Sequence, residues 1–326
     1  MTVIARIPYK DGLLLVSDSR VTNGRVPYRQ KIIVSSENVI GAAEGSVDLV
    51  ECLNKILTKD SAEISNSDFG KVTADIEALM KAEPNLKEFL IERGFGAIIF
   101  GASRRDSGNV EPFLVDVQPA LNVIAAGRVQ KGECWANGID GSQRMLDSLV
   151  YNYRYNPNQA SELEAEVIGY ILVKLQEANP AFGLYVGDPL EMCAIGSNST
   201  NAFWMDHEVD GRDVTQERSK WDYIDDSLKV DDKKENLIKS VAKLANLYPE
   251  KLGALAEFAE NHAKEFSVLD AIAQSKRSEF EMLLNMVAKD EDKALSVIRE
   301  LYIKTTEKEG NPNKKQKAKG SDSGPI

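Results

Sequence analysis

Short apolar runs alternate with turn signals through the first 45 residues, and this alternation constrains the fold more than any other feature of the sequence. The runs are residues 2–7, 13–17, 31–34 and 39–43. Asp11 and Gly12 separate the first two runs, and an Asp-Gly pair supplies the positive φ that a tight hairpin needs. Runs of this length between turn residues predict four β-strands with polar connections.

The rest of the first 205 residues groups its predicted helices and strands into clusters. Helical periodicity or helix-start signals mark residues 47–57, 67–80, 84–91, 142–149 and 159–177. Strand character marks residues 95–100, 112–117, 121–126, 191–195 and 201–205. Clusters of this kind favour sheets packed together beneath helices over alternating βαβ units. We therefore predict an α+β fold with four layers, an αββα sandwich.

The composition changes near residue 206, and we predict four parts in the chain. Residues 1–208 form the α+β domain, and residues 209–233 form an acidic linker. Residues 234–308 carry helical periodicity throughout and predict an all-α C-terminal extension. Residues 309–326 are rich in Gly, Pro, Ser and Lys, so we expect a disordered basic tail. In so acidic a chain, this lysine-rich tract is typical of a solubilising tail.

Composition and charge argue against several classes of function. The chain has 326 residues and a net charge of -11, which gives no electrostatic reason to expect a nucleic-acid partner. Its three cysteines and two histidines form neither a zinc pattern nor a disulfide framework, and they support a Ser-His-Asp site poorly. We see no signal peptide and no apolar run of roughly 20 residues, so we expect a cytoplasmic protein with no membrane partner. We also expect no metal and no cofactor.

Thr2 has the residue type and the position of an N-terminal nucleophile. It directly follows Met1, and cytoplasmic aminopeptidase normally removes methionine before a small second residue. Its hydroxyl would then be the nucleophile and its own α-amine the base. The α-amine has an ordinary pKa of about 7.7–8, and a nearby ammonium such as Lys31 would lower that pKa and favour the neutral amine. Asp18, at the end of the second predicted strand, could keep Lys31 charged in a cleft.

Backbone N–H groups near Gly45 and Ser46 could stabilise the oxyanion that forms during acyl transfer. Both residues stand at the entry to the helix predicted from Val47, where the helix dipole helps. Taken singly, these features have ordinary explanations, since Asp18 suits a turn at a strand end and Lys31 suits a solvated strand edge. Their order along a strand, hairpin, strand, strand and helix pattern favours the combined catalytic interpretation.

Several segments together resemble one known family. They are Thr2 with Val3, residues 10–22 (KDGLLLVSDSRVT), Lys31 with Ile32, residues 43–48 (AEGSVD) and residues 184–191 (LYVGDPLE). The first four resemble the opening of proteasome β-subunit-type N-terminal-nucleophile (Ntn) hydrolases, which include the bacterial relatives HslV and Anbu. The last is similar to a Val-Gly-Pro-Pro segment of Anbu-type members. The resemblance covers about residues 2–205.

The resemblance implies an Ntn-type αββα sandwich and a role for each site residue. It implies that Thr2 is the nucleophile, that Asp18 and Lys31 assist it, and that Gly45 with its neighbour Ser46 provides the oxyanion donor.

The residues that support the site in the family are only partly matched. Family members carry a serine in a glycine-rich turn, where Ile139 stands in this sequence, and Asp140 and Ser142 lie nearby. We take these two residues and Ser19 as candidate supporting residues. The family's supporting aspartate has no match in residues 181–185.

The resemblance implies a threonine endopeptidase that acts on peptide or protein substrates and forms a homo-oligomeric ring or open spiral. The C-terminal helices could cap that assembly, recruit substrate or bind an ATPase or adaptor. Two alternatives stay open. One is a catalytically inactive proteasome-like scaffold, and the other is an Ntn acyltransferase or amidase that acts on small amides or ligates peptides.

Overall fold

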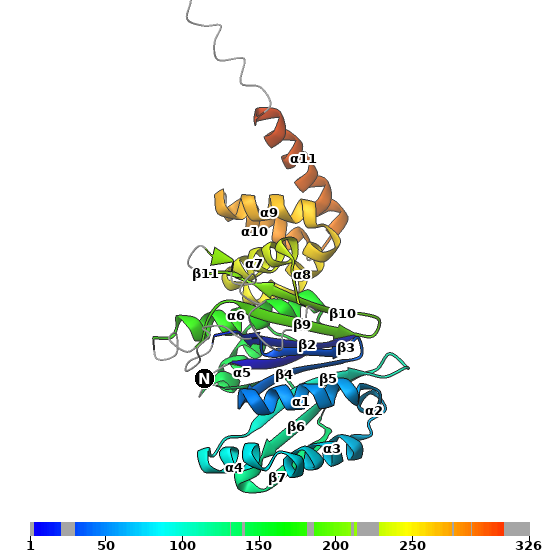
Figure 1. The fold of residues 1–326 in the computed structure, drawn as a ribbon. Coiled ribbons are helices and arrows are strands. Elements are labelled where there is room, and N and C mark those ends of the chain that lie inside the picture. Colours follow the sequence, from blue (N-terminus) through cyan, green and yellow to red (C-terminus); the bar gives the residue numbers. More distant parts are fainter. Residues whose placement is uncertain are drawn as a thin grey trace, which may run out of the picture. The chain divides into compact units, whose positions relative to one another are not determined.

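The structure is a computed structural model that describes most of the chain (Figure 1). The described residues are 3–20, 30–130, 132–138, 141–180, 186–209, 212–213, 228–275, 277–287 and 289–309. Several residues and segments for which the sequence makes predictions lie outside these ranges. These are Thr2, Asp140, the loop at residues 21–29, residues 181–185, most of the predicted linker and the predicted tail beyond residue 309.

The first of two main sheets has six strands, in the order β13-β10-β9-β2-β1-β8. Its strands are β1 (Ile4–Tyr9), β2 (Gly12–Asp18), β8 (Trp135–Asn137), β9 (Leu190–Gly196), β10 (Thr200–Met205) and β13 (Lys229–Val230). All neighbours are antiparallel except β10 and β13. In the central pair, β2 lies on β9 so that Ser17 is directly opposite Glu191.

The second main sheet has five antiparallel strands in chain order. They are β3 (Ile32–Ser36), β4 (Val39–Gly45), β5 (Ala97–Arg104), β6 (Val110–Gln118) and β7 (Val123–Arg128). A short 3-10 turn, η1 (Pro119–Leu121), connects the last two strands. Two strands of two residues each, β11 (Glu208–Val209) and β12 (Arg212–Asp213), form a separate small antiparallel pair.

The two main sheets share a buried apolar core. Leu13 and Leu15 of β2 and Cys193 of β9 cluster there with Ile40 and Ala102 of the other sheet. Side chains alternate along a strand, so residues two apart face the same side. The odd-numbered residues of β2 and β9 therefore face the five-stranded sheet.

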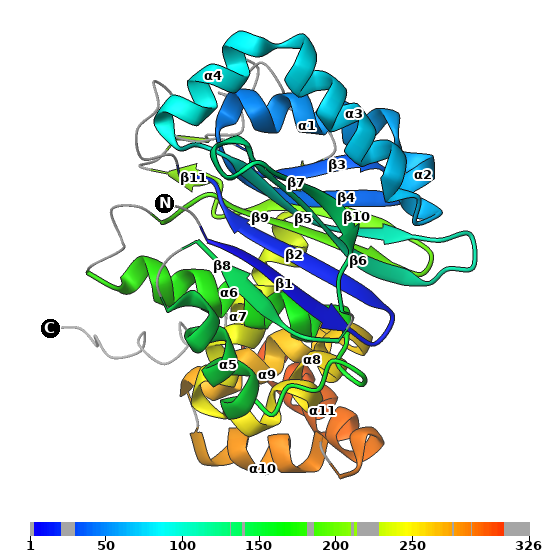
Figure 2. The same cartoon turned by 90° about the horizontal axis from the view of Figure 1, so that it is seen from below.

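Helices pack on the outer face of each main sheet (Figure 2). A second apolar core joins the five-stranded sheet to α1 (Val47–Lys59), α2 (Ser61–Ser65), α3 (Phe69–Ala82) and α4 (Pro84–Arg93). The six-stranded sheet carries α5 (Ser142–Asn152) and α6 (Glu162–Ala178) on its outer side. Gly169 of α6 allows close packing there, because a Cβ on it would lie 2.5 Å from a methyl group of Val16. These observations establish a mixed α/β fold with two main sheets.

A third helix, α7 (Asp232–Leu247), packs against α6. Its N-cap is Asp231, whose side chain accepts the N–H of Lys234. The Lys234 ammonium lies 2.7 Å from a carboxylate oxygen of Glu162 and 2.6 Å from one of Glu166, both on α6. Contacts of the Lys234 ammonium with Glu162 and buried Glu166 therefore attach α7 to the outer helical layer.

The chain divides into two compact units, residues 1–253 and residues 254–326. This division places α7 with the first unit, whereas the sequence analysis put all helices after residue 234 in one extension. The second unit contains most of α8 (Leu252–Asn261), together with α9 (Ala263–Ser275), α10 (Arg277–Val287) and α11 (Glu291–Glu309). Its buried side chains include Phe266, Leu269, Phe280, Leu283 and Ile298. The predicted C-terminal helical region is thus confirmed. None of the helices in the described ranges is long and apolar enough to cross a membrane.

Candidate functional site

Asp18 ends strand β2 and binds two groups that the sequence analysis placed around the nucleophile. Its Oδ1 accepts the backbone N–H of Val3 at 2.7 Å, and Val3 directly follows Thr2 in the chain. The same oxygen lies 2.9 Å from Nζ of Lys31. The side chain of Asp18 is 0% exposed and that of Lys31 is 12% exposed. The carboxylate therefore connects the start of β1 to an ammonium group with little access to water.

Lys31 stands directly before β3, so the pair spans both main sheets. Its ammonium also donates to the carbonyl oxygen of Arg20 at 3.0 Å. Its own carbonyl oxygen accepts the N–H of Ala43, on β4, at 2.9 Å. Three independent contacts thus hold the residue by its side chain and its backbone.

Glu191 is a buried acidic residue of this site that the sequence analysis did not single out. Its two carboxylate oxygens accept the Lys31 N–H at 3.1 and 2.9 Å, and Oε2 also accepts the Ile32 N–H at 2.7 Å. The hydroxyl of Ser19 bonds to Oε1. Burial raises the pKa of Glu191 to about 8, although the hydrogen bonds from Ser19 and from the two amides act in the opposite direction. A glutamate within the otherwise apolar run 190–195 was the available sequence signal.

Gly45, at the end of β4, has a backbone conformation that favours glycine. Its φ is +120°, and a Cβ at this position would lie 2.2 Å from the carbonyl oxygen of Gly96. Gly45 lies opposite Ala97 on β5, but the bond at this end of the ladder runs from the Ser46 N–H to Gly96 at 2.8 Å. In an antiparallel ladder this pattern turns the Gly45 N–H away from β5. It therefore points to the same edge of β4 as the Ala43 N–H, which is the edge beside Lys31.

The Ser46 amide has a different role from the one expected. Because its N–H already bonds to Gly96 and its carbonyl accepts the Val50 N–H at 2.9 Å, Ser46 closes the β4–β5 ladder and starts α1. Of the two candidate oxyanion donors, only the Gly45 amide points to the edge of β4 on which β3 lies.

A third acidic residue, Glu44, lies near the ammonium of Lys31. The amide group of Asn137, on β8, donates to Glu44 at 2.6 Å and so forms a second polar link between the main sheets. Burial raises the pKa of Glu44, while the Asn137 hydrogen bond and the charge of Lys31 partly oppose that change.

The candidate supporting residues are separated in the structure. Ser19 reaches the backbone of Lys31 through Glu191. Ser142 is buried at the start of α5, and its hydroxyl accepts a hydrogen bond of 3.3 Å from Gln176 on α6. The structure therefore brings Ser19 to the site and places Ser142 in the contact between α5 and α6. Asp140 lies outside the described residues.

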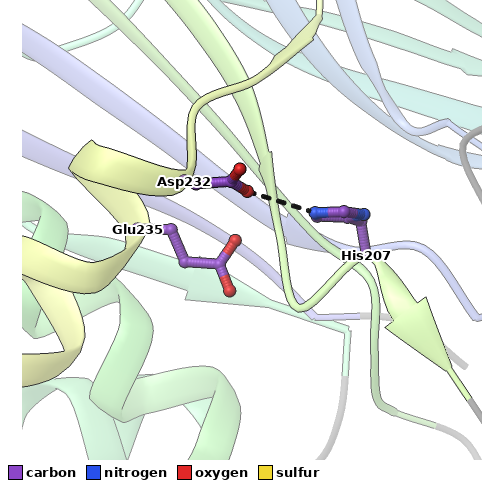
Figure 3. Close-up of side chains that lie close together, drawn as sticks. All are labelled: His207, Asp232 and Glu235. Carbon is purple, nitrogen blue, oxygen red and sulfur yellow. Dashed lines mark ion pairs between the residues drawn. The ribbon is translucent and has the colours of Figure 1, made fainter. Parts of the chain in front are cut away.

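A separate cluster of potential metal ligands lies between the segment that follows β10 and the first turn of α7 (Figure 3). Candidate ligand atoms of His207, Asp232 and Glu235 lie within 4.8 Å of one another, and His207 Nε2 is 3.6 Å from Asp232 Oδ1. The ammonium of Lys239 already bonds to Glu235. The side chain of Asp232 is 76% exposed. The bound ammonium and the exposed carboxylate favour a surface ion-pair network over a metal centre.

No protein-family model matches this sequence, and no curated protein matches it. The chemistry of the site is therefore inferred from its own residues.

Proposed function

We propose that this protein is an Ntn hydrolase, a threonine endopeptidase that cleaves peptide bonds through an acyl-enzyme on Thr2 after Met1 is removed. One observation supports this most directly. The Asp18 carboxylate binds both the amide that follows Thr2 and the ammonium of Lys31. The covalent bond from Thr2 to Val3 puts the Thr2 carbonyl carbon about 1.3 Å from that amide nitrogen. An N-terminal Thr2 would therefore begin beside the ion pair.

The first chemical step is attack by the Thr2 hydroxyl on the substrate carbonyl. The α-amine of Thr2 takes the hydroxyl proton as Oγ forms a bond to the carbonyl carbon. The nearby Lys31 ammonium favours the neutral, proton-accepting form of that amine. Asp18 holds the ammonium in place, because it supplies the opposite charge in a site that water barely reaches.

The tetrahedral intermediate carries an oxyanion that needs a hydrogen-bond donor. The N–H of Gly45 serves this purpose, since it points away from β5 on the side of Lys31. When the intermediate collapses, the C–N bond breaks and the leaving amine takes the proton held by the Thr2 amine. Water then hydrolyses the remaining ester and restores the hydroxyl.

The fold is consistent with this assignment. Two main sheets share a core, and each carries helices on its outer face. We propose that this is the four-layer αββα sandwich of Ntn hydrolases, with the site at the end of β2 near the first residues of β1. In this proposal the protein acts on peptides or proteins in the cytoplasm as a homo-oligomeric ring or spiral. The C-terminal helices would bind an adaptor or an ATPase.

Covalent labelling of the purified full chain tests the proposal. An epoxyketone is a suitable electrophile, because it reacts with N-terminal threonine nucleophiles. We expect wild type to lose Met1, as judged from its intact mass, and to gain one probe mass. Thr2→Ala should not be labelled. Thr58→Ala is the matched control, since Thr58 is an exposed residue on α1, and it should be labelled like wild type.

Three outcomes would count against the proposal. Retention of Met1 on the whole population would exclude nucleophile chemistry in that form of the protein. Equal labelling of Thr2→Ala would place the reactive group elsewhere. A folded wild type that lacks Met1 and is not labelled would favour the scaffold alternative. Turnover of peptides compared with small amides separates the peptidase from the amidase.

A further inference from the structure

The buried carboxyl group of Glu191 connects the two main sheets at the site. Ser17 and Glu191 are directly opposite each other on β2 and β9, two residues beyond the pair formed by Leu15 and Cys193. Leu15 and Cys193 belong to the core between the sheets. Residues two apart on a strand share a face, so Glu191 also faces the five-stranded sheet. It is 0% exposed, at the end of an apolar layer.

A carboxyl group in such a position needs hydrogen-bond donors, because an unsatisfied buried polar group is costly. Glu191 obtains them from the other sheet. The N–H groups of Lys31 and Ile32 point to it at 2.7 to 3.1 Å. A third donor, the Ser19 hydroxyl, comes from the segment that follows β2. One side chain thus sets where β3 begins relative to the end of β2.

Glu191 and Asp18 together hold both the backbone and the side-chain ammonium of Lys31. Its backbone N–H bonds to Glu191 on β9, and its ammonium bonds to Asp18 on β2, which neighbours β9. A flexible lysine side chain reaches a given point only if its backbone stays in place. Without the Glu191 contacts, the backbone at Lys31 would keep its bond to Ala43 of β4 but lose its bonds to β9, while Asp18 itself would stay where it is.

The geometry points to Glu191 as a positioning residue for Lys31, a role that rests on the proposed function. Glu191 acts through the backbone of Lys31 and does not touch the reacting atoms. Misplacement of a catalytic group by about 1 Å can lower a rate about 100-fold. Loss of this residue should therefore affect the rate of bond formation more than the affinity for the probe.

Glu191→Met tests this role, because methionine has a similar length and no comparable acceptor. Epoxyketone labelling of the full chain gives kinact, the rate of bond formation, and KI, the apparent affinity. We expect kinact to fall about 10- to 100-fold with KI little changed. Glu191→Gln should restore most of kinact, since its amide oxygen can still accept both backbone N–H groups and its NH2 can donate to Ser19.

Glu166→Met is the matched control. Glu166 is also a glutamate with 0% exposure, but it lies on α6 and pairs with Lys234 on α7. This variant should label with the wild-type kinact once folding is verified by circular dichroism. If Glu191→Met does not fold, Ser19→Ala removes one of the Glu191 bonds and should lower kinact about 2- to 10-fold.

The results separate this inference from the proposed function. If wild type is labelled at Thr2 and both glutamate-to-methionine variants keep the wild-type kinact, or both lose it equally, Glu191 has no positioning role and the proposed function stands. An unchanged kinact in Ser19→Ala, where Glu191→Met does not fold, would also overturn the role. If wild type is not labelled, the proposed function fails and the role fails with it.

Discussion

At the scale of single residues, Asp18 and Lys31 form an ion pair that is almost removed from water. The Asp18 side chain is 0% exposed and lies 2.9 Å from the Lys31 ammonium. Removal of one partner from a buried pair leaves an uncompensated charge, and this typically costs about 3–5 kcal/mol. Removal of either partner alone should therefore lower stability as well as the proposed activity.

Asp18→Asn should lower the free energy of unfolding by about 3–5 kcal/mol, measured by urea denaturation. The matched control is Asp75→Asn, because Asp75 and Lys59 form a pair at 2.6 Å whose lysine is 64% exposed. An exposed pair contributes about 0–1 kcal/mol, so the control should change little. Equal losses in the two variants would show that burial does not strengthen the dependence on Asp18.

Gly45→Ala should lower the free energy of unfolding by about 1–3 kcal/mol, because the left-handed φ and the 2.2 Å approach to Gly96 both oppose a Cβ. Gly127→Ala on β7 is the control, since a Cβ there would have nothing within 4 Å. Its change should stay within about 0.5 kcal/mol. A Gly45→Ala protein as stable as wild type would argue against the backbone conformation described for β4.

Site residues that lie next to a sequence motif could be predicted from the sequence. Site residues that only strand pairing brings to the site could not. Asp18, Lys31 and Gly45 stand at the ends of short apolar runs, so their places at strand ends could be predicted. Glu191 joins them only because β9 lies beside β2, some 170 residues away in sequence. No periodicity specifies that register. The same limit applies to Asn137, which reaches Glu44 across the two sheets.

At the scale of secondary-structure elements, the attachment of α7 to α6 depends on a buried acid. Glu166 is fully buried on α6, and burial raises its pKa to about 8 from the ordinary 4.5, against the opposing charge of Lys234. The folded protein thus retains a proton that the unfolded chain releases. Stability from this group is fully present below about pH 4.5 and is lost as the pH rises to about 8.

Glu166→Gln should remove this pH dependence, because glutamine stays neutral. We expect the stability of wild type relative to this variant to decrease from about pH 5 to pH 8, with a slope of at most about 1.4 kcal/mol per pH unit. Urea denaturation at several pH values measures it. A difference that is constant or that grows with pH would contradict the raised pKa.

The ends of helices and strands show which local sequence signals are sufficient to predict an element boundary. Pro84 stands at the first turn of α4, where its missing N–H costs nothing, and Gly94 ends that helix in the left-handed conformation. Both signals could be read directly from the sequence. The strand expected from residue 121 begins instead at Val123, since Pro119 starts a 3-10 turn. The short strand β8 was missed, because three residues carry no period.

At the scale of the whole molecule, the chain divides into two compact units. Leu53 belongs to the core beneath α1 and α3, whereas Leu283 is buried within the C-terminal helices. Chains with more than one compact unit often unfold in separate steps, and a single free energy of unfolding then does not describe the molecule.

Paired leucine variants test this independence. Each substitution, Leu53→Ala and Leu283→Ala, should destabilise its own unit by about 2–5 kcal/mol. In scanning calorimetry each variant should shift a different component of the unfolding transition. A single transition that both variants shift equally would show that the chain unfolds as one cooperative unit.

The most direct measurement for the central claim is the attachment site of the epoxyketone, mapped by tandem mass spectrometry on wild-type protein. Both reactive carbons of this probe can bond to the hydroxyl and the α-amine of one N-terminal threonine. The account predicts one adduct, on an N-terminal peptide that begins at Thr2 and lacks Met1. An adduct on any other residue, or an unmodified Thr2 at the N-terminus of a folded protein after prolonged exposure, would contradict it.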